Sequence, residues 1–306
     1  MSQVITVALP VFAIIAAGFA AGRLAALNSA DTQTLNKFVF RIAMPAALFG
    51  LAASTPPPGA GDAGIAIAYA CGAGAALAVG YLFSKRIFSL TGPEAGAHAF
   101  CATLGNAVFL GLPIALNIEG WARPFIVLML IEGTIVIAIG AALMTNRENA
   151  KGFMSYITGP LKNPLVIAMG AGFIYSALGL SLTGPVETFF DYLGRAAGPT
   201  ALISLGLFLA THKFPPVRNV AGRVSLITAT KMVLLPAIAL IIAHMLGVND
   251  PAWLGALALF VFVPSGVSSF VIASQYGISQ TETAAAVLTT TIISILTVSG
   301  VLVVFG

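Results

Sequence analysis

The sequence predicts an all-α integral membrane protein whose ten membrane-spanning helices form a 5+5 inverted repeat. Three observations predict this class: the composition, the lengths of the apolar segments, and a break at corresponding places in the two halves. Of the 306 residues, 58% are hydrophobic and 8% are charged, whereas a soluble domain carries about a quarter charged residues. The mean hydropathy is +1.00. These values exclude a soluble globular domain.

Ten apolar segments are long enough to span a bilayer, and polar or Pro/Gly-rich stretches separate them. The expected helices are 4–22, 35–54, 62–84, 95–116, 122–145, 164–182, 188–210, 220–246, 253–275 and 281–304. No Lys or Arg precedes the first segment, so we expect a retained helix rather than a secretory signal. The expected units are a first five-helix repeat at 1–145, a cytoplasmic link at 146–163 and a second repeat at 164–306.

The two halves share residues at a constant offset of 154 positions. The matched pairs are Pro10 and Pro164, Gly18 and Gly172, Phe19 and Phe173, Arg41 and Arg195, Pro45 and Pro199, and Leu48 and Leu202. Five helices per half is an odd number, so the second half enters the membrane upside down relative to the first. Inverted repeats of this kind are typical of secondary transporters.

Basic residues in the connections predict the orientation. Ten Lys and Arg lie after the first, third, fifth and seventh helices, whereas the opposite side holds Arg123. The ten are Arg23, Lys37, Lys85, Arg86, Arg147, Lys151, Lys162, Lys213, Arg218 and Arg223. The positive-inside rule therefore places both termini outside the cell (inner) membrane and the central link in the cytoplasm. The net charge of +4 is explained by this bias, and no nucleic-acid partner is expected.

The fourth and ninth segments each contain residues that interrupt a helix. In the fourth, Gly105 to Pro113 includes two glycines, an asparagine and a proline, which are poor residues for a helix interior. The ninth has its own break at Pro264 to Ser269. Backbone groups that such breaks release must find partners in protein or line a water-filled cavity. Two broken spans in corresponding positions point to a transporter's substrate site.

We expect the substrate where the two breaks meet. The positive N-terminal ends of the half-helices suit a carboxylate, and the Asn106 amide can donate a hydrogen bond to it. The predicted substrate-binding residues are Gly105, Asn106, Gly111, Pro113, Pro264, Gly266, Ser268 and Ser269. The structural alternatives are a helix–helix hydrogen bond for Asn106 and close helix packing for the glycines and serines.

Ionisable residues inside the spans are costly and are usually functional or paired. Lys231 and Glu132 are coupling candidates, with a mutual structural ion pair as the alternative. Lipid-facing snorkelling is favoured for Arg41 and Arg195, and packing for His98. The cysteines, Cys71 and Cys101, fall in apolar spans, so we expect small buried side chains rather than a disulfide or a metal site.

Two of these motifs carry a resemblance to a known family. Asn106-Ala-Val-Phe-Leu-Gly111-Leu-Pro113 resembles the fourth-helix signature of the auxin efflux carrier family, which includes the plant PIN exporters and bacterial malonate or malate carriers. Pro264-Ser-Gly266-Val-Ser-Ser-Phe270-Val-Ile-Ala-Ser-Gln-Tyr276 resembles its ninth-helix signature. Lys231-Met-Val-Leu-Leu-Pro236 and Met44-Pro45-Ala-Ala-Leu also fit. The resemblance spans nearly the whole chain.

This resemblance implies a ten-helix fold shared with the bile-acid sodium symporters. In that fold a transport domain moves against a scaffold domain, as in an elevator, and two broken helices cross in an X. It also implies carriage of organic anions. Ser269 stands where the plant exporters have a proline, so the ninth-helix break depends on Pro264 and Gly266. The long cytoplasmic loop of the plant proteins is reduced here to a short link.

The function expected is secondary active transport of a small organic anion, such as malonate, malate or an auxin-like carboxylate, by alternating access. The alternatives are a sodium-coupled symporter of the bile-acid type, for which Gln275 and Glu282 are the candidate residues, and a passive channel. Catalytic and phosphate-binding motifs are absent from the sequence, so we expect neither an enzyme nor a cofactor or metal. The sequence leaves open whether the coupling ion is a proton, sodium or none. It also leaves open whether the protein forms a homodimer.

Overall fold

The computed structural model describes residues 2–55, 59–144, 163–212 and 217–306. Over these ranges the chain is helical, and no strand occurs apart from one isolated β-bridge between Gly105 and Ser265. In the first half the helices are α1 (Ser2–Arg23), α2 (Ser29–Phe38), α3 (Met44–Ser54), α4 (Ala63–Phe88), α5 (Gly92–Cys101), α6 (Leu112–Ala115), α7 (Ala122–Ile131) and α8 (Ile137–Met144). The second half has α10 (Pro164–Ala177), α11 (Gly184–Thr211), α12 (Val217–Ala229), α13 (Leu235–Met245), α14 (Pro251–Phe262), α15 (Val267–Tyr276) and α16 (Gln280–Phe305).

The chain is a multi-pass membrane protein by the length and composition of its helices. Six helical stretches are long and apolar enough to cross a membrane. They are Ser29–Ser54, Ala63–Phe88, Ala122–Met144, Gly184–Thr211, Val220–Met245 and Gln280–Phe305. Phe12–Arg23, Pro164–Ala177 and Pro251–Phe262 are shorter apolar helices. The arrangement of ten spans in two inverted repeats stays a prediction.

The second helical stretch begins earlier than the sequence predicted, at Ser29 instead of residue 35. A capping box causes the difference. The Asn28 side chain accepts from the Ala30 N–H, and the Asp31 carboxylate accepts from the Asn28 N–H. A capped helix start is stable in polar sequence, so hydropathy alone places the boundary too late. The sixth helix, predicted to residue 182, ends at Ala177.

Wide π turns interrupt several of the long helices. Three of them precede a proline: Val39–Ala43 before Pro45, Ala107–Gly111 before Pro113, and Thr230–Leu234 before Pro236. A proline cannot donate a helical hydrogen bond, and its ring clashes with the carbonyl four residues before it. Widening the preceding turn relieves that clash and keeps the helix going.

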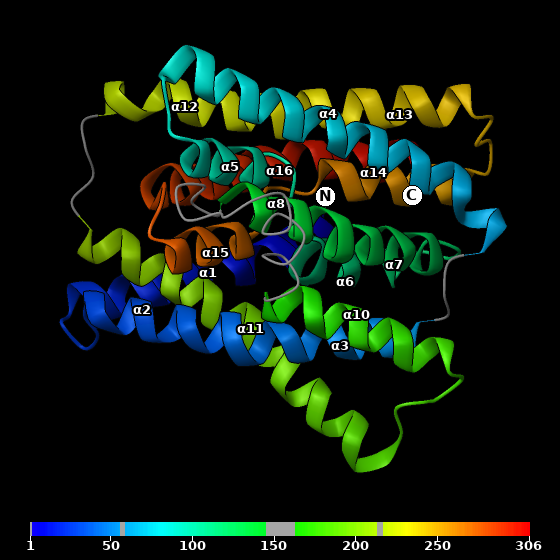
Figure 1. Ribbon diagram of the computed structural model, residues 1–306, viewed down its shortest axis with the longest axis horizontal. Coiled ribbons are helices and arrows are strands. Elements are labelled where there is room, and N and C mark those ends of the chain that lie inside the picture. Colours follow the sequence, from blue (N-terminus) through cyan, green and yellow to red (C-terminus); the bar gives the residue numbers. More distant parts are fainter. Residues whose placement is uncertain (1, 56–58, 145–162, 213–216) are drawn as a thin grey trace, which may run out of the picture.

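The helices pack into two groups. In the first group α1 and α2 pack on α11, and α3 packs on both α10 and α11. In the second group α4 packs on α5 and α13, α5 packs on α8, and α16 packs on α12, α14 and α15. Figure 1 shows α2, α3, α10 and α11 along the lower side and α4, α12 and α13 along the upper side. Contacts between the groups are sparser, and include α11 and α2 against α15.

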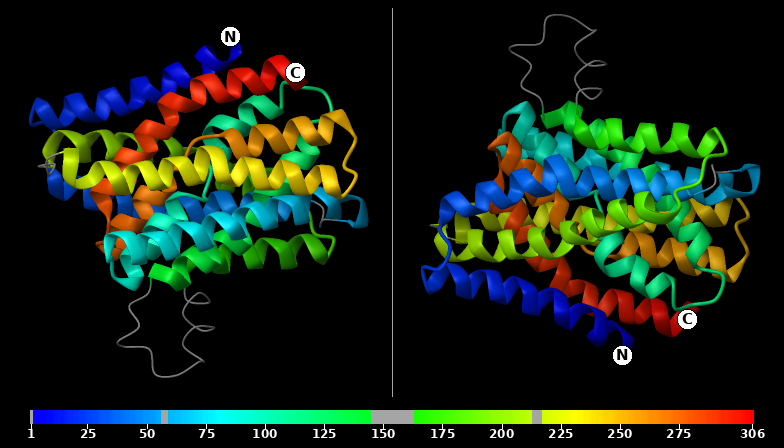
Figure 2. Two further views of the ribbon diagram at one scale, coloured as in Figure 1. Left: turned by 90° about the horizontal axis from the view of Figure 1, so that it is seen from above. Right: turned by 90° about the horizontal axis from the view of Figure 1, so that it is seen from below.

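Glycines bring the helices of the first group into backbone contact. A Cβ on Gly18 of α1 would overlap the backbone of Ile203 in α11, and a Cβ on Gly172 of α10 would lie 2.7 Å from the Phe49 carbonyl oxygen in α3. Gly172 lies 154 positions after Gly18, and Phe49 lies 154 positions before Ile203, so the second contact is the first one with the two halves exchanged. The two termini lie on the same side of the molecule (Figure 2), where α1 contacts α16.

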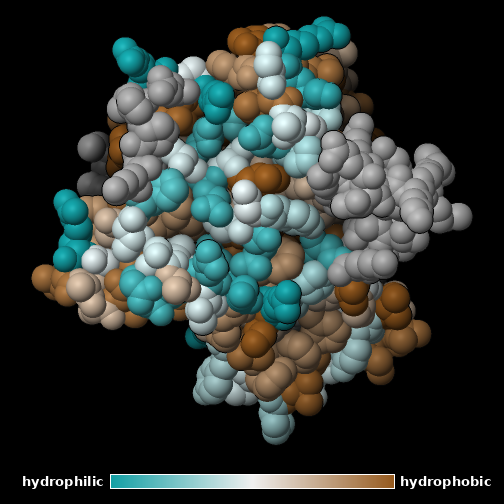
Figure 3. Space-filling model, turned by 60° about the vertical axis from the view of Figure 1, so that its left-hand side comes forward, coloured by the Kyte–Doolittle hydropathy of each residue, from teal (hydrophilic) through white to brown (hydrophobic). Residues whose placement is uncertain are grey.

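Basic residues gather at one end of the molecule. The connections α1–α2, α4–α5 and α15–α16 all lie at the left-hand end of Figure 1, and Arg23, Lys85 and Arg86 occur there in the last turns of α1 and α4. Figure 3, which brings this end forward, shows hydrophilic side chains over its middle and hydrophobic ones on its lower flank. Arg147, Lys151, Lys162 and Lys213, and all of the predicted link 146–163 except Asn163, lie outside the described residues.

Candidate functional site: the crossing of two broken helices

The two breaks predicted from the sequence meet each other. The Asn106 N–H donates to the Pro264 carbonyl at 2.8 Å, and the Gly266 N–H donates to the Leu104 carbonyl at 2.9 Å. These bonds flank the isolated bridge between Gly105 and Ser265. Backbone N–H and C=O groups that lose their helical partners at one break therefore pair with backbone groups at the other break. Buried backbone groups in a membrane protein need such partners.

Gly266 is required by the closeness of this crossing. A Cβ at that position would lie 2.7 Å from the Gly105 carbonyl oxygen, which real Cβ atoms do not tolerate. At Gly111, a Cβ would overlap the ring of Phe125. Pro113 lies in the first turn of α6, directly after the π turn. The two glycines thus allow close packing, and the proline lies where the π turn of the second half-helix passes into α6.

Hydroxyl groups brace the ninth-helix break. The Ser265 Oγ donates to the Cys101 carbonyl at 2.8 Å, and the Ser265 N–H donates to the Thr290 Oγ1 at 3.0 Å. The Ser269 Oγ donates to the Gly266 carbonyl at 2.7 Å. Sequence analysis singled out Ser269 but missed Ser265 and Thr290. Ser268 is half-buried and makes none of the hydrogen bonds found in the described part of the chain.

A buried carboxylate braces the fourth-helix break. The Glu132 Oε1 accepts from the Gly105 N–H at 2.8 Å and from the Tyr69 hydroxyl at 2.9 Å. Glu132 is 5% exposed and opens the π turn Glu132–Val136, which connects α7 to α8. Sequence analysis selected Glu132 for its charge. Tyr69, in the second turn of α4, gave no signal because a tyrosine in an apolar span is common.

Lys231 lies beside the same glycine. Its side chain is 1% exposed, and its Nζ donates to the Val261 carbonyl at 3.5 Å. A Cβ built on Gly105 would lie 3.4 Å from the Glu132 Oε1 and 3.5 Å from the Lys231 Nζ. Among the ion pairs of the described residues, none joins Lys231 to Glu132 within 4 Å. The two groups therefore lie at the crossing on separate helices without forming a direct salt bridge.

The electrostatics of the crossing favour an anion. Beyond the breaks, the half-helices start at Ala107 and Val267, so two N-terminal ends with their free N–H groups face the same region. Asn106 is 3% exposed and sits directly before one of these ends. An amide and two positive helix ends at one buried position are suited to a carboxylate.

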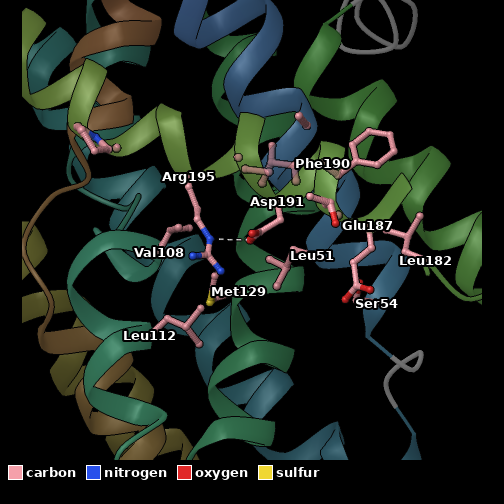
Figure 4. A pocket seen from close by; sticks show the side chains of 18 of the residues that line it. Leu51, Ser54, Val108, Leu112, Met129, Leu182, Glu187, Phe190, Asp191 and Arg195 are labelled. Atoms are coloured by element: carbon pink, nitrogen blue, oxygen red, sulfur yellow. Dashed lines mark hydrogen bonds and ion pairs between the residues drawn. The ribbon is translucent and has the colours of Figure 1, made fainter. Parts of the chain in front are cut away.

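A cavity of about 840 Å³ lies between the two helix groups. Figure 4 shows Val108, Leu112 and Met129 on one side of it and Arg195 with Asp191 on the other. The Arg195 Nε donates to the Asp191 Oδ1 at 2.7 Å. Sequence analysis favoured snorkelling of Arg195 to lipid headgroups, and this stays a prediction. The Arg195 side chain is 78% exposed, and its carboxylate partner Asp191 lies one turn earlier on α11.

The other candidates lie away from the crossing. His98 is buried and its Nδ1 lies 3.1 Å from the Ser84 Oγ, and Arg41 is exposed on the π turn of the second helical stretch. Glu282 pairs with Arg223 at 2.9 Å. Both cysteines are free; Cys101 is buried, but Cys71 is exposed on α4, so the expectation of two buried cysteines was wrong for Cys71 because it lies on the outer face of its helix.

A sequence model of membrane transport proteins matches residues 3–158 and 153–302. Together with the apolar helices and their crossed breaks, this match defines the class as a multi-pass membrane transport protein. The chain belongs to the auxin efflux carrier family.

Three relatives are similar over most of their length. A protein of Rhizobium meliloti named "Putative malonate transporter" is 26% identical over 316 residues, covering 99% of this chain and 96% of that protein. The uncharacterized transporter YfdV of Escherichia coli is 24% identical, covering 90% of each chain. An uncharacterized transporter of Methanothermobacter thermautotrophicus is 24% identical, covering 94% of this chain and 93% of that protein.

Proposed function

We propose that the protein is a secondary active transporter of a small organic anion, with the substrate carboxylate at the crossing of the two broken helices. The observation that carries this proposal is the pairing of Asn106 with Pro264 and of Gly266 with Leu104. This pairing holds two half-helix N-termini and the Asn106 amide at one buried position. The relative named for malonate transport supports a short dicarboxylate as the first substrate to test.

Alternating access is supported by the packing of the helices into two groups. The cavity of about 840 Å³ is bounded by Val108 and Leu112, just beyond the crossing, and by Arg195 of the other group. A shift of one group against the other would change the side from which the crossing is reached. In this proposal α1, α2, α3, α10 and α11 form the scaffold, the remaining helices form the transport domain, and the ten spans form two inverted repeats.

Transport is tested with the purified protein in liposomes. Radiolabelled malonate should accumulate with saturation and exchange against internal malonate, and the same assay with and without sodium or a proton gradient identifies the coupling ion. Saturable counterflow separates a carrier from a channel, because a channel gives flux that unlabelled substrate on the far side does not accelerate. A wild-type protein that moves none of the mono- or dicarboxylates tested would contradict the proposal.

Lys231 is the proposed coupling residue. Its ammonium reaches the Val261 carbonyl and the crossing without a direct salt bridge, so it is placed to respond to an anion there. We expect Lys231→Ala to leave malonate exchange measurable and to abolish uptake driven by the proton gradient. The measurement is exchange and gradient-driven uptake in the same liposome preparation. Full gradient-driven uptake by the variant would rule out this role.

A further inference from the structure

A second cavity, of about 440 Å³, lies at the basic end of the molecule, away from the crossing. Its wall joins the two helix groups, because α2 and α11 supply one side and α15 with the start of α16 supplies the other. Polar residues of this wall include Thr32, Asn36, Lys37, Ser274 and Gln280. Measured along α15 at about 1.5 Å per residue, Ser274 is about 12 Å from the crossing at Gly266.

Three polar side-chain atoms in this wall are buried without a partner among the described residues: Thr32 Oγ1, Asn36 Nδ2 and Ser274 Oγ. Thr32 is 5% exposed and Asn36 is 1% exposed. The Asn36 Oδ1 accepts from the Ser204 Oγ at 2.7 Å, whereas its Nδ2 is buried and unpaired in the wall of the cavity. Buried donors are costly when unpaired, so three in one cavity point to a polar occupant.

The charge of the wall selects an anion. Lys37 and His212 belong to the lining, and the described lining contains no Asp or Glu. Gln280 is the first residue of α16, so the positive end of a long helix also faces this cavity. The opposing negative end of α15 is capped, since the N–H groups of Gly277 and Ile278 donate to the last carbonyls of that helix.

We propose that this cavity is a second carboxylate-binding site, separate from the crossing, which holds the transported anion at the cytoplasmic end. The proposal rests on the proposed function for the identity of the anion. Asn36 Nδ2 and the Thr32 and Ser274 hydroxyls receive one carboxylate, and Lys37 receives the second carboxylate of a dicarboxylate. Because the site joins both helix groups, a bound anion holds them in one relative position and must leave before they move.

The first test removes one donor and keeps the shape of the side chain. Thr32→Val should weaken malonate binding about tenfold, as expected for a hydrogen bond to an ionised group. The same change should leave the melting temperature of the unliganded protein unchanged or higher, because the deleted hydroxyl has no partner. Calorimetry is done in the Asn106→Ala background, which suppresses binding at the crossing. Thr34→Val is the matched control, since Thr34 is exposed on the same helix and outside the cavity.

A second variant keeps the test decisive if Thr32→Val misfolds. Asn36→Asp preserves the acceptor for Ser204 and replaces the donor by a negative charge, so malonate binding in the Asn106→Ala background should be lost. Unchanged malonate affinity in both cavity variants would overturn the proposal and leave water as the occupant. Binding of inorganic phosphate but not of malonate would overturn the carboxylate assignment. Malonate binding that depends on Thr32, with no transport by the wild-type protein, would uphold the site and contradict the proposed function.

Discussion

Different kinds of side chain stabilise the breaks in the fourth and ninth helices. The fourth-helix break is braced by one buried carboxylate, since Glu132 accepts from the Gly105 N–H. The ninth-helix break is braced by neutral hydroxyls, with Ser265 bonded to Cys101 and Thr290 and with Ser269 bonded to Gly266. A change of charge at Glu132 therefore acts directly on the fourth-helix break, whereas the hydroxyl brace of the ninth-helix break carries no charge. The Lys231 ammonium contacts that helix one turn earlier, at the Val261 carbonyl. We therefore expect the fourth-helix break to respond to a change of charge at Glu132 (the responsive break) and the ninth-helix break to keep its geometry (the fixed break).

Removing the charged brace should have the largest effect on stability. Glu132→Ala deletes the acceptor for two hydrogen bonds and leaves the nearby Lys231 without its compensating charge, so the free energy of unfolding should fall by about 3 kcal/mol. Glu132→Gln keeps an acceptor oxygen and should cost about 1 kcal/mol. Equilibrium unfolding in mixed micelles measures both. Equal losses in the two variants would contradict the hydrogen-bonding role of the carboxylate.

Closing the space between the two backbones should have the next largest effect. Gly266→Ala places a Cβ 2.7 Å from the Gly105 carbonyl oxygen, and such overpacking costs about 2 kcal/mol. Gly300→Ala is the control, because a Cβ there meets no atom within 4 Å of the described chain. The unfolding free energies of the two variants are compared in the same micelles. A Gly266→Ala protein as stable as the control would contradict the close crossing.

The neutral brace should contribute less than the charged one. Ser265→Ala removes the hydroxyl that donates to the Cys101 carbonyl, and we expect a loss of about 1 kcal/mol in the free energy of unfolding. Ser268→Ala is the matched control in the next turn and should be neutral. If Ser265→Ala costs as much as Glu132→Ala, the contrast between a responsive and a fixed break is wrong.

Asn106→Ala should have the smallest effect on stability and a large effect on transport. A side-chain hydrogen bond in a membrane helix bundle averages about 0.6 kcal/mol, so we expect a fall of about that size in the free energy of unfolding. Loss of an amide that donates to a carboxylate should lower malonate uptake about tenfold or more. Initial uptake rates are normalised to the amount of folded protein in the liposomes. Near-normal uptake would remove Asn106 from the substrate site.

The sequence revealed the breaks but not what braces them. Glycine, asparagine and proline at Gly105 to Pro113 are visible as poor helix formers, so that break could be predicted from local propensity alone. The bond from Tyr69 to Glu132 joins residues 63 positions apart, and the bond from Ser265 to Thr290 depends on how α16 packs. Neither partner differs locally from an ordinary residue of an apolar helix. The early start of α2 was missed for a related reason, since a capping box lies in polar sequence.

The paired glycine contacts of the first helix group determine where the molecule can deform. Gly18 against Ile203 and Gly172 against Phe49 bring helix backbones together with no side chain between them. A side chain between two helices can change rotamer and act as a compliant spacer, whereas two touching backbones cannot yield. The first helix group should therefore move as a rigid body. Deformation should occur at its boundary with the second group. That boundary is also where both cavities lie.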